Sequence, residues 1–167
     1  RDANWRVVNA SEVADVYVIN SCTVTAEADR QSRQQVRRLA RHNPRAKIVI
    51  TGCYAEMQPE TCGEVAGVDL VVGNANKFNI PALASQLLEG RVSIGSAGSR
   101  PAEVMGRPTP LLYGYERRTR ASVQIQQGCD QACTFCVIHT ARGLSRSFPQ
   151  GDIVKQVRHW VTSGYKE

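Results

Sequence analysis

Two matching stretches, "VYVINSC" at 16–22 and "KIVITGC" at 47–53, decide the fold. Each is a short apolar run, rich in β-branched residues, that leads into a cysteine. Nearly continuous apolar runs of this kind are typical of strands that are buried on both faces of a parallel sheet. Together with the similar run "GVDLVV", they predict strands at 13–20, 46–51 and 67–72.

Helical patterns separate and follow these predicted strands. The first helix is expected at about 27–42, with Thr25 as its N-terminal cap and Pro44 after its end. A second helix is expected over part of 57–67, and a third at 79–90. Strands that alternate with helices imply parallel pairing, so the predicted fold class is α/β.

The composition changes after this first domain, which we assign to 1–90. A stretch rich in Gly, Ser and Pro at 91–120 is typical of an interdomain linker. In the remaining part, 121–167, alternation predicts a strand at 120–126, and periodicity predicts a helix at 152–162. The residues of this helix expected to face a core are Ile153, Val157, Trp160 and Val161. One strand, one loop and one helix cannot bury their own apolar faces, so we expect further strands of this second domain beyond residue 167.

The overall composition is that of a globular protein. Of the 167 residues, 42% are hydrophobic and 22% are charged, and no run of about 18 apolar residues indicates a membrane span. Clustered cysteines without an export signal favour the reducing cytoplasm over a disulfide framework. The net charge of +6 suits a partner with phosphate groups, such as a nucleic acid.

A second cysteine-bearing stretch, "QQGCDQACTFCVIHTARG" at 126–143, has three thiols within eight positions: Cys129, Cys133 and Cys136. Iron–sulfur clusters are usually held by four cysteine thiolates, so a loop with three leaves one iron open to an external ligand. The alternative is a structural zinc ion, for which His139 completes a Cys3His set. Both kinds of metal site remain open at this point.

The first domain predicts a second thiol site. Cys22 and Cys53 follow matching strands, and the carboxyl ends of parallel strands share one edge of the sheet, where open α/β folds bind ligands. Two inert cysteines are the alternative, because a free cysteine behaves as a small apolar residue. Cys62 lies at no strand end, and we interpret it as structural.

These motifs resemble a known family. The stretch from Cys129 to Cys136, with Phe135 before the last cysteine, resembles the signature of radical S-adenosylmethionine (radical SAM) enzymes. The methylthiotransferase branch of that superfamily is similar over most of the chain, as in "VINSCTVTAEADRQSRQ", "ITGCYAE" and "GVDLVVGNANKFNI". The resemblance implies an N-terminal Rossmann-like parallel-sheet domain, followed by the first strand, loop and helix of a partial TIM barrel.

The resemblance also implies the cofactors. Cys129, Cys133 and Cys136 would hold a [4Fe-4S] cluster that binds S-adenosylmethionine, with Phe135 near the adenine or filling the core of the loop. An auxiliary [4Fe-4S] cluster would be held by Cys22, Cys53 and a third cysteine that we expect before Arg1, in an opening strand. With such truncations at both ends, we expect the chain alone not to complete the reaction.

The implied reaction is methylthiolation. One S-adenosylmethionine methylates sulfur at the auxiliary cluster, and another, after reduction by an electron donor, yields a radical that abstracts hydrogen from the substrate carbon. Substrates in this branch are threonylcarbamoyl- or isopentenyl-modified adenosine beside the tRNA anticodon, or an aspartate of a ribosomal protein. The wording "CTVTAEADRQSRQ" most resembles the group that acts on C2 of N6-threonylcarbamoyladenosine. A hypothesis of another class is a noncatalytic RNA-binding module stabilised by zinc.

Two sets of arginines are candidates for further contacts. The first set shares one side of the first predicted helix and forms either a solvated surface or an RNA-backbone contact. The second set flanks the three-cysteine loop and either touches cofactor or substrate or braces the loop through backbone hydrogen bonds. The first set is Arg30, Arg33, Arg37 and Arg41, and the second is Arg142 and Arg146.

Overall fold

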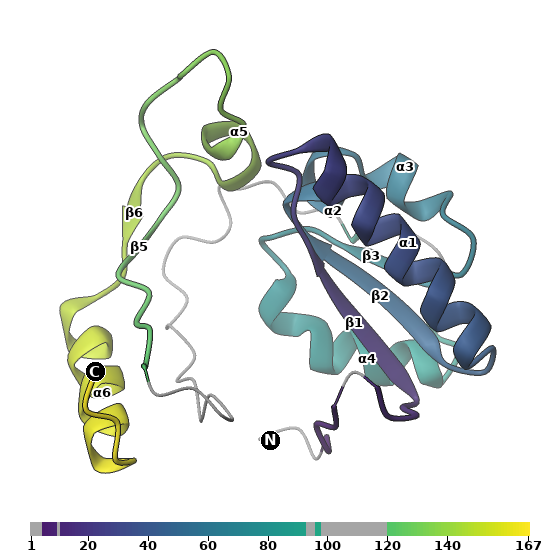
Figure 1. The fold of residues 1–167 in the computed structure, drawn as a ribbon, viewed down its shortest axis with the longest axis horizontal. Coiled ribbons are helices and arrows are strands. Elements are labelled where there is room, and N and C mark those ends of the chain that lie inside the picture. The colour runs from purple at the N-terminus through teal and green to yellow at the C-terminus, as the bar shows by residue number, and fades with distance from the viewer. Residues whose placement is uncertain (1–4, 10, 93–95, 98–119) are drawn as a thin grey trace.

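A parallel sheet, visible at the right of Figure 1, organises the first domain. The computed structural model describes residues 5–9, 11–92, 96–97 and 120–167. The sheet has the order β1-β2-β3-β4, and every neighbouring pair is parallel. Its strands are β1 (Val16–Ser21), β2 (Lys47–Gly52), β3 (Leu70–Val72) and β4 (Ser96–Ala97). The three predicted strands and the α/β class are thus confirmed, with β1 starting three residues later than expected.

Alternate residues of the strands face two different cores. Ile48, Ile50 and Val71 pack with the helices on one face of the sheet. Val49, Leu70 and Val72 belong to a second cluster on the opposite face. Figure 1 shows α1 (Ala26–His42) and α3 (Pro59–Gly63) on the first face and α4 (Ile80–Leu88) on the second. Burial on both faces explains why these strands are continuous apolar runs rather than alternating ones.

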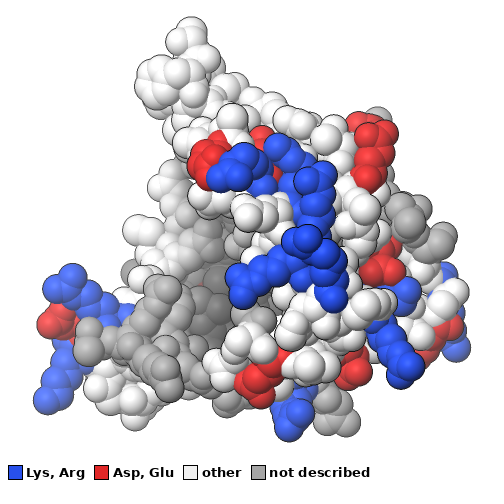
Figure 2. Space-filling view, turned by 45° about the vertical axis from the view of Figure 1, so that its right-hand side comes forward, with Lys and Arg blue, Asp and Glu red and all other residues white. Residues whose placement is uncertain are grey.

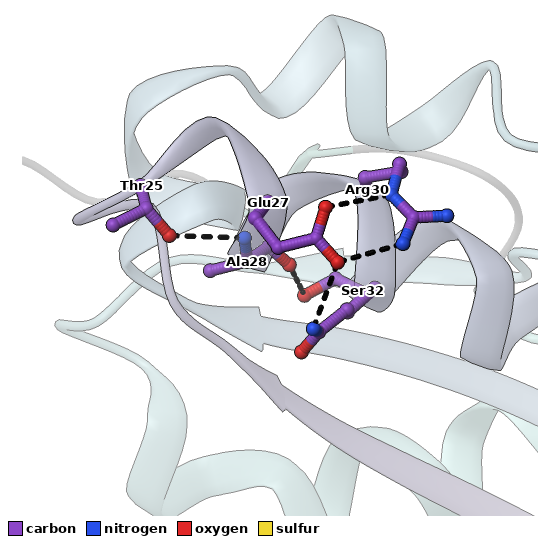
Figure 3. A network of polar contacts seen from close by, with 6 residues as sticks. Thr25, Glu27, Ala28, Arg30 and Ser32 are labelled. Atoms are coloured by element: carbon purple, nitrogen blue, oxygen red, sulfur yellow. Dashed lines mark hydrogen bonds and ion pairs between the residues drawn. The ribbon is translucent and has the colours of Figure 1, made fainter.

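The start of α1 is fixed by a local network of polar contacts, shown in Figure 3. Thr25 caps the helix as predicted, because its Oγ1 accepts a hydrogen bond of 3.1 Å from the backbone N–H of Ala28. The Glu27 carboxylate accepts hydrogen bonds of 2.7 Å from the Arg30 guanidinium and a third from the Gln31 amide. These contacts stabilise the first turn, where the backbone N–H groups have no partners within the helix.

The second predicted helix is two short ones. α2 (Cys53–Met57) ends before Gln58, and Pro59 begins α3. Proline has no N–H to donate and restricts the residue before it, so one continuous helix cannot pass this point. A short 3-10 helix, η1 (Lys77–Asn79), leads directly into α4.

The C-terminal part departs from expectation in two places. The predicted strand at 120–126 is wrong for most of its length: only β5 (Gln126–Gln127) forms, antiparallel to β6 (Arg146–Ser147), and Ile125 is 58% exposed. The final helix, α6 (Gln150–Thr162), buries Trp160 as predicted but leaves Val157 and Val161 exposed. The apolar side chains of the first stretch and of the outer part of α6 therefore remain largely open to solvent.

Most of the predicted linker at 91–120 lies outside the described residues. Within it, Ser96–Ala97 pair with β3 and extend the parallel sheet, so this part of the linker prediction is wrong. Among the residues that are described, no helix is long and apolar enough to cross a membrane.

Candidate functional site

The strand ends bring Cys22 and Cys53 to one edge of the sheet. Ser21 and Gly52, the last residues of β1 and β2, are register partners, and the two cysteines follow them immediately. The environments of the thiols differ, since Cys22 is exposed and Cys53, the first residue of α2, is only 4% exposed. This edge therefore offers one open thiol and one sheltered thiol, both free.

Gly52 makes this close approach of the strands possible. Its φ is 99°, in the left-handed region, and a Cβ there would collide with the Ser21 carbonyl oxygen and lie 2.8 Å from the Ser21 nitrogen. Ser21 also accepts a hydrogen bond of 3.4 Å from the Ala55 N–H through its own hydroxyl, which in turn donates to the Thr51 carbonyl. The turn into α2 is thus tied to β1 directly beside the two cysteines.

Cys62 lies in the core, as its interpretation as a structural residue requires. Its side chain is fully buried against α1 and the sheet. Burial raises the pKa of this thiol to about 12, and the nearby Asp29 carboxylate adds to the shift. A thiol that stays protonated at neutral pH is a poor metal ligand.

The three-cysteine loop connects β5 to α5 (Ile138–Arg142). Its two ends are joined, because the Cys129 N–H donates to the Gly143 carbonyl over 3.1 Å. Gly128 allows this closure: its φ is 82°, and a Cβ there would collide with the Leu144 carbonyl oxygen. Asp130 strengthens the base of the loop by accepting a hydrogen bond of 2.8 Å from the Ser145 N–H.

The donor set of this loop fits an iron–sulfur cluster in its chemistry. Cys129 and Cys136 are half-buried, Cys133 is exposed, and all three thiols are free. A hydrogen bond of 3.0 Å from the Cys136 N–H to the Cys133 carbonyl forms a turn between two of them. Across the described residues, no three His, Cys, Asp or Glu side chains converge on one metal-ion position. The loop thus supplies three accessible thiols without yet gathering them around one point.

Two neighbours of the loop thiols have different surroundings. Phe135 is 91% exposed, so the interpretation that it fills the core of the loop is wrong. The Nε2 atom of His139 lies 3.2 Å from the Thr140 hydroxyl, and its Nδ1 atom is buried without a partner among the described residues. His139 is on α5, beyond the turn that carries Cys133 and Cys136.

The loop and the sheet edge meet through α5, which lies beside α2 at the top of Figure 1. Arg142 Nε donates to the Cys53 sulfur over 3.5 Å. One residue earlier, the buried Ala141 accepts a hydrogen bond of 2.8 Å at its carbonyl from the Asn74 amide. Asn74 is itself held by its N–H, which donates to Glu56 on α2 over 2.6 Å. These contacts join residues up to 89 positions apart, and no sequence pattern indicated them.

Arg146 braces the loop, as one of its two interpretations required. Its guanidinium donates to the Arg142 carbonyl over 2.9 Å. It also lines a cavity of only about 10 Å³ together with Glu56, Asn74 and Gln127. Such a cavity is at the lower limit for one water molecule, so the contact region between loop and sheet edge is closely packed.

Arginines of α1 form hydrogen bonds within that helix and to α2. Arg30 pairs with Glu27, and Arg33 donates to the hydroxyl of the buried Tyr54 over 3.0 Å. Arg41 donates to the Arg37 carbonyl. Figure 2, which turns the side carrying α1 toward the viewer, shows Lys and Arg side chains in a band with acidic side chains beside it. Arg33 is therefore part of the packing of α1, not only of a solvated surface.

Comparison with known proteins shows a consistent set of similar sequences. The family described as "Uncharacterized protein family UPF0004" matches residues 1–73. A threonylcarbamoyladenosine tRNA methylthiotransferase of Bacillus subtilis, MtaB, is 40% identical over the whole chain, and one of Aquifex aeolicus is 42% identical over 98% of it. A tRNA-2-methylthio-N(6)-dimethylallyladenosine synthase of Christiangramia forsetii is 34% identical over 93% of the chain.

Over nearly its whole length, the chain is similar to methylthiotransferases of the MtaB-like family. It spans 37% of the Bacillus subtilis relative, 40% of the Aquifex aeolicus relative and 33% of the Christiangramia forsetii relative. The chain therefore spans well under half the length of the relatives that it matches.

Proposed function

We propose that the protein containing this chain transfers a methylthio group to C2 of N6-threonylcarbamoyladenosine beside the anticodon of tRNA. The observation that carries this proposal is the match of 40% and 42% identity, over almost the whole chain, to two relatives with that name. Identity to the relative named for dimethylallyladenosine is lower, at 34%. An isopentenyl-modified adenosine is accordingly the second candidate, and an aspartate of a ribosomal protein the third.

We further propose that two [4Fe-4S] clusters and S-adenosylmethionine are the cofactors. Cys129, Cys133 and Cys136 would hold the first cluster, and their being free and at least partly exposed supports this. Cys22 and Cys53 would supply two ligands of the auxiliary cluster, and their neighbouring places at one sheet edge support that pairing. When bound, these groups supply reductive cleavage of S-adenosylmethionine, a carbon-centred radical and sulfur for the transfer.

The chain's own residues would position these groups. The closed base of the loop, from Gly128 to Gly143, limits how far the three thiols can spread. Phe135, being almost fully exposed, offers an aromatic face for the adenine of S-adenosylmethionine. The contact of α5 with α2 would keep the loop beside Cys53.

The proposed partners follow from this activity. A net charge of +6 supports binding of the phosphate backbone of tRNA. Reduction of the cluster requires an electron donor, and a tRNA substrate supports a location in the cytoplasm.

Mass spectrometry of tRNA nucleosides from a strain that lacks the gene tests the substrate. We expect 2-methylthio-N6-threonylcarbamoyladenosine to disappear, its unmethylthiolated precursor to accumulate, and the gene to restore the product. A variant with Cys133→Ser should fail to restore it. Unchanged methylthio-threonylcarbamoyladenosine, with loss of the isopentenyl product instead, would replace the first substrate by the second.

The zinc-stabilised RNA-binding module is separated by metal analysis after anaerobic reconstitution of the whole protein. The enzyme proposal predicts iron and acid-labile sulfide in equal amounts, with cleavage of S-adenosylmethionine that is lost in Cys133→Ser. Tight stoichiometric zinc, no labile sulfide and no cleavage would establish the zinc module instead.

A further inference from the structure

We propose that Arg142 is a positioning residue that sets the electronic environment of the Cys53 sulfur. The inference rests on the proposed function, because it concerns Cys53 as a cluster ligand. It adds a residue outside the thiol set. Its basis is the hydrogen bond of 3.5 Å from Arg142 Nε to Cys53 Sγ, which crosses from α5 to the start of α2.

The sulfur end of this contact is buried, and the arginine end is open to solvent. Cys53 is 4% exposed, whereas Arg142 is an exposed residue, so the hydrogen bond between them is partly buried. Solvent screens the guanidinium charge over longer distances, but the direct hydrogen bond keeps that charge next to the sulfur. Hydrogen bonds to ligand sulfurs are one of the factors that set the potential of an iron–sulfur cluster.

The backbone before and after Arg142 is held by hydrogen bonds. The Ala141 carbonyl is bound by the Asn74 amide, and the Arg142 carbonyl by Arg146. The next residue, Gly143, accepts the N–H of Cys129 over 3.1 Å. The Cys53 sulfur is therefore connected to the backbone of Cys129 by the hydrogen bond from Arg142, the peptide bond between Arg142 and Gly143, and the hydrogen bond from Cys129 to Gly143.

The contacts that dock α5 differ from the contact that reaches the Cys53 sulfur. Asn74 and Glu56 dock α5 through its backbone, without touching either sulfur in any described contact. Arg142 alone among the described residues donates a hydrogen bond to the Cys53 sulfur. Loss of the docking contacts should loosen α5. Loss of the guanidinium should leave α5 in place and remove the hydrogen bond to the Cys53 sulfur.

The test uses the whole protein, reconstituted anaerobically with iron and sulfide, in the variants Arg142→Gln and Arg142→Lys. Arg158→Gln is the charge-matched control, because Arg158 is exposed on α6 at the other end of the C-terminal part (Figure 1). The readouts are iron content, the reduction potential of each cluster followed by electron paramagnetic resonance, and hydrogen exchange of residues 138–142.

We expect Arg142→Gln to retain the iron content of the wild type and to lower the potential of the auxiliary cluster, because removing a positive charge destabilises the more negative reduced state. Arg142→Lys should recover part of the shift, and Arg158→Gln should leave the potential unchanged. Asn74→Ala, by contrast, should speed hydrogen exchange in α5.

Three results would overturn the inference. A wild-type protein that loads both clusters, with an unchanged auxiliary potential in Arg142→Gln, would refute the role of Arg142 and leave the proposed function standing. A wild-type protein without any auxiliary cluster would refute both the role of Arg142 and the proposed function. Equal shifts in Arg142→Gln and Arg158→Gln would show a general effect of net charge, and this also refutes a specific contact.

Discussion

Replacing Gly52 by alanine tests the geometry of the edge that carries Cys22 and Cys53. Gly52 has a φ of 99°, and a Cβ would collide with the Ser21 carbonyl and lie 2.9 Å from Asn20 Oδ1. With ψ at −166°, this backbone conformation is essentially restricted to glycine and costs any other residue roughly 1–3 kcal/mol. Moving β1 away also breaks at least one hydrogen bond of the β1–β2 ladder, for about 1 kcal/mol more.

We therefore expect Gly52→Ala to lower the free energy of unfolding by about 3 kcal/mol or to prevent folding, since the two terms add. Urea unfolding followed by circular dichroism measures this, and with a slope of about 2 kcal/mol/M the midpoint falls by roughly 1.5 M. Displacement of Ser21 should also lower retention of the auxiliary cluster.

Two other glycines provide matched controls. Gly90 has a φ of 70°, but no atom lies within 4 Å of the place that a Cβ would take, so Gly90→Ala should show the backbone cost alone, roughly 1–2 kcal/mol. Gly63 lies in α3 with its nearest contact at 3.9 Å, and Gly63→Ala should be neutral or stabilising by up to about 1 kcal/mol. If Gly52→Ala unfolds no more readily than Gly90→Ala, the two strands are not in close contact at this edge and the reasoning is refuted.

Four further predictions concern titration, thiol modification and capping. Hydrogen bonds from Arg30, and then from Gln31, lower the pKa of Glu27 to about 2 from 4.5, so the stabilisation from this carboxylate is present above pH 4.5 and is lost as the pH falls toward 2. Glu27→Gln should flatten that part of a stability–pH curve, and a curve parallel to the wild type would contradict the contact. Burial raises the pKa of Cys62 from 9.0 to about 12, so the stabilisation from its neutral thiol is full below pH 9 and is lost as the pH rises toward 12. Cys62→Ala should remove this decrease in the free energy of unfolding above pH 9. In the metal-free native protein, iodoacetamide should modify the exposed Cys133 and spare Cys62, as peptide mass spectrometry would show. Thr25→Ala should cost about 1 kcal/mol by removing the cap of α1, while Thr25→Ser should cost far less, measured by urea unfolding.

The sheet was predictable because its strands are buried on both faces. Ile48 and Val49 point to opposite clusters, so consecutive positions of β2 are apolar, and the resulting run is visible in the sequence. The same holds for α1, whose start is marked by Thr25 and Glu27 as residue types with defined roles at a helix N-terminus.

The C-terminal part was less predictable because alternating apolar residues do not reveal whether another element packs against them. Val123 and Ile125 alternate with polar residues, yet Ile125 is 58% exposed and the ladder begins only at Gln126. The apolar spacing of α6 similarly predicts one buried face, whereas Val161 is 64% exposed. Local periodicity states which side of an element can be buried, while burial itself depends on what packs there.

Within the site, residue types were predictable and distances were not. The equivalent places of Cys22 and Cys53 followed from the match between two strands, and their neighbouring register positions confirm it. The contact of Arg142 with Cys53 joins two elements far apart in the sequence, and arginine beside a cysteine loop has many other possible partners. Only the packing of α5 on α2 identifies which sulfur it meets.

The closed base of the three-cysteine loop has a consequence for metal uptake. Joining the ends of a flexible loop of about 14 residues has an entropic cost of roughly 2 kcal/mol, and here folding meets that cost through Gly128 and the hydrogen bond from Cys129 to Gly143. A metal centre arriving at this loop has only to rotate side chains and adjust the turn between Cys133 and Cys136. Its assembly thereby becomes a local rearrangement within a preformed ring of backbone.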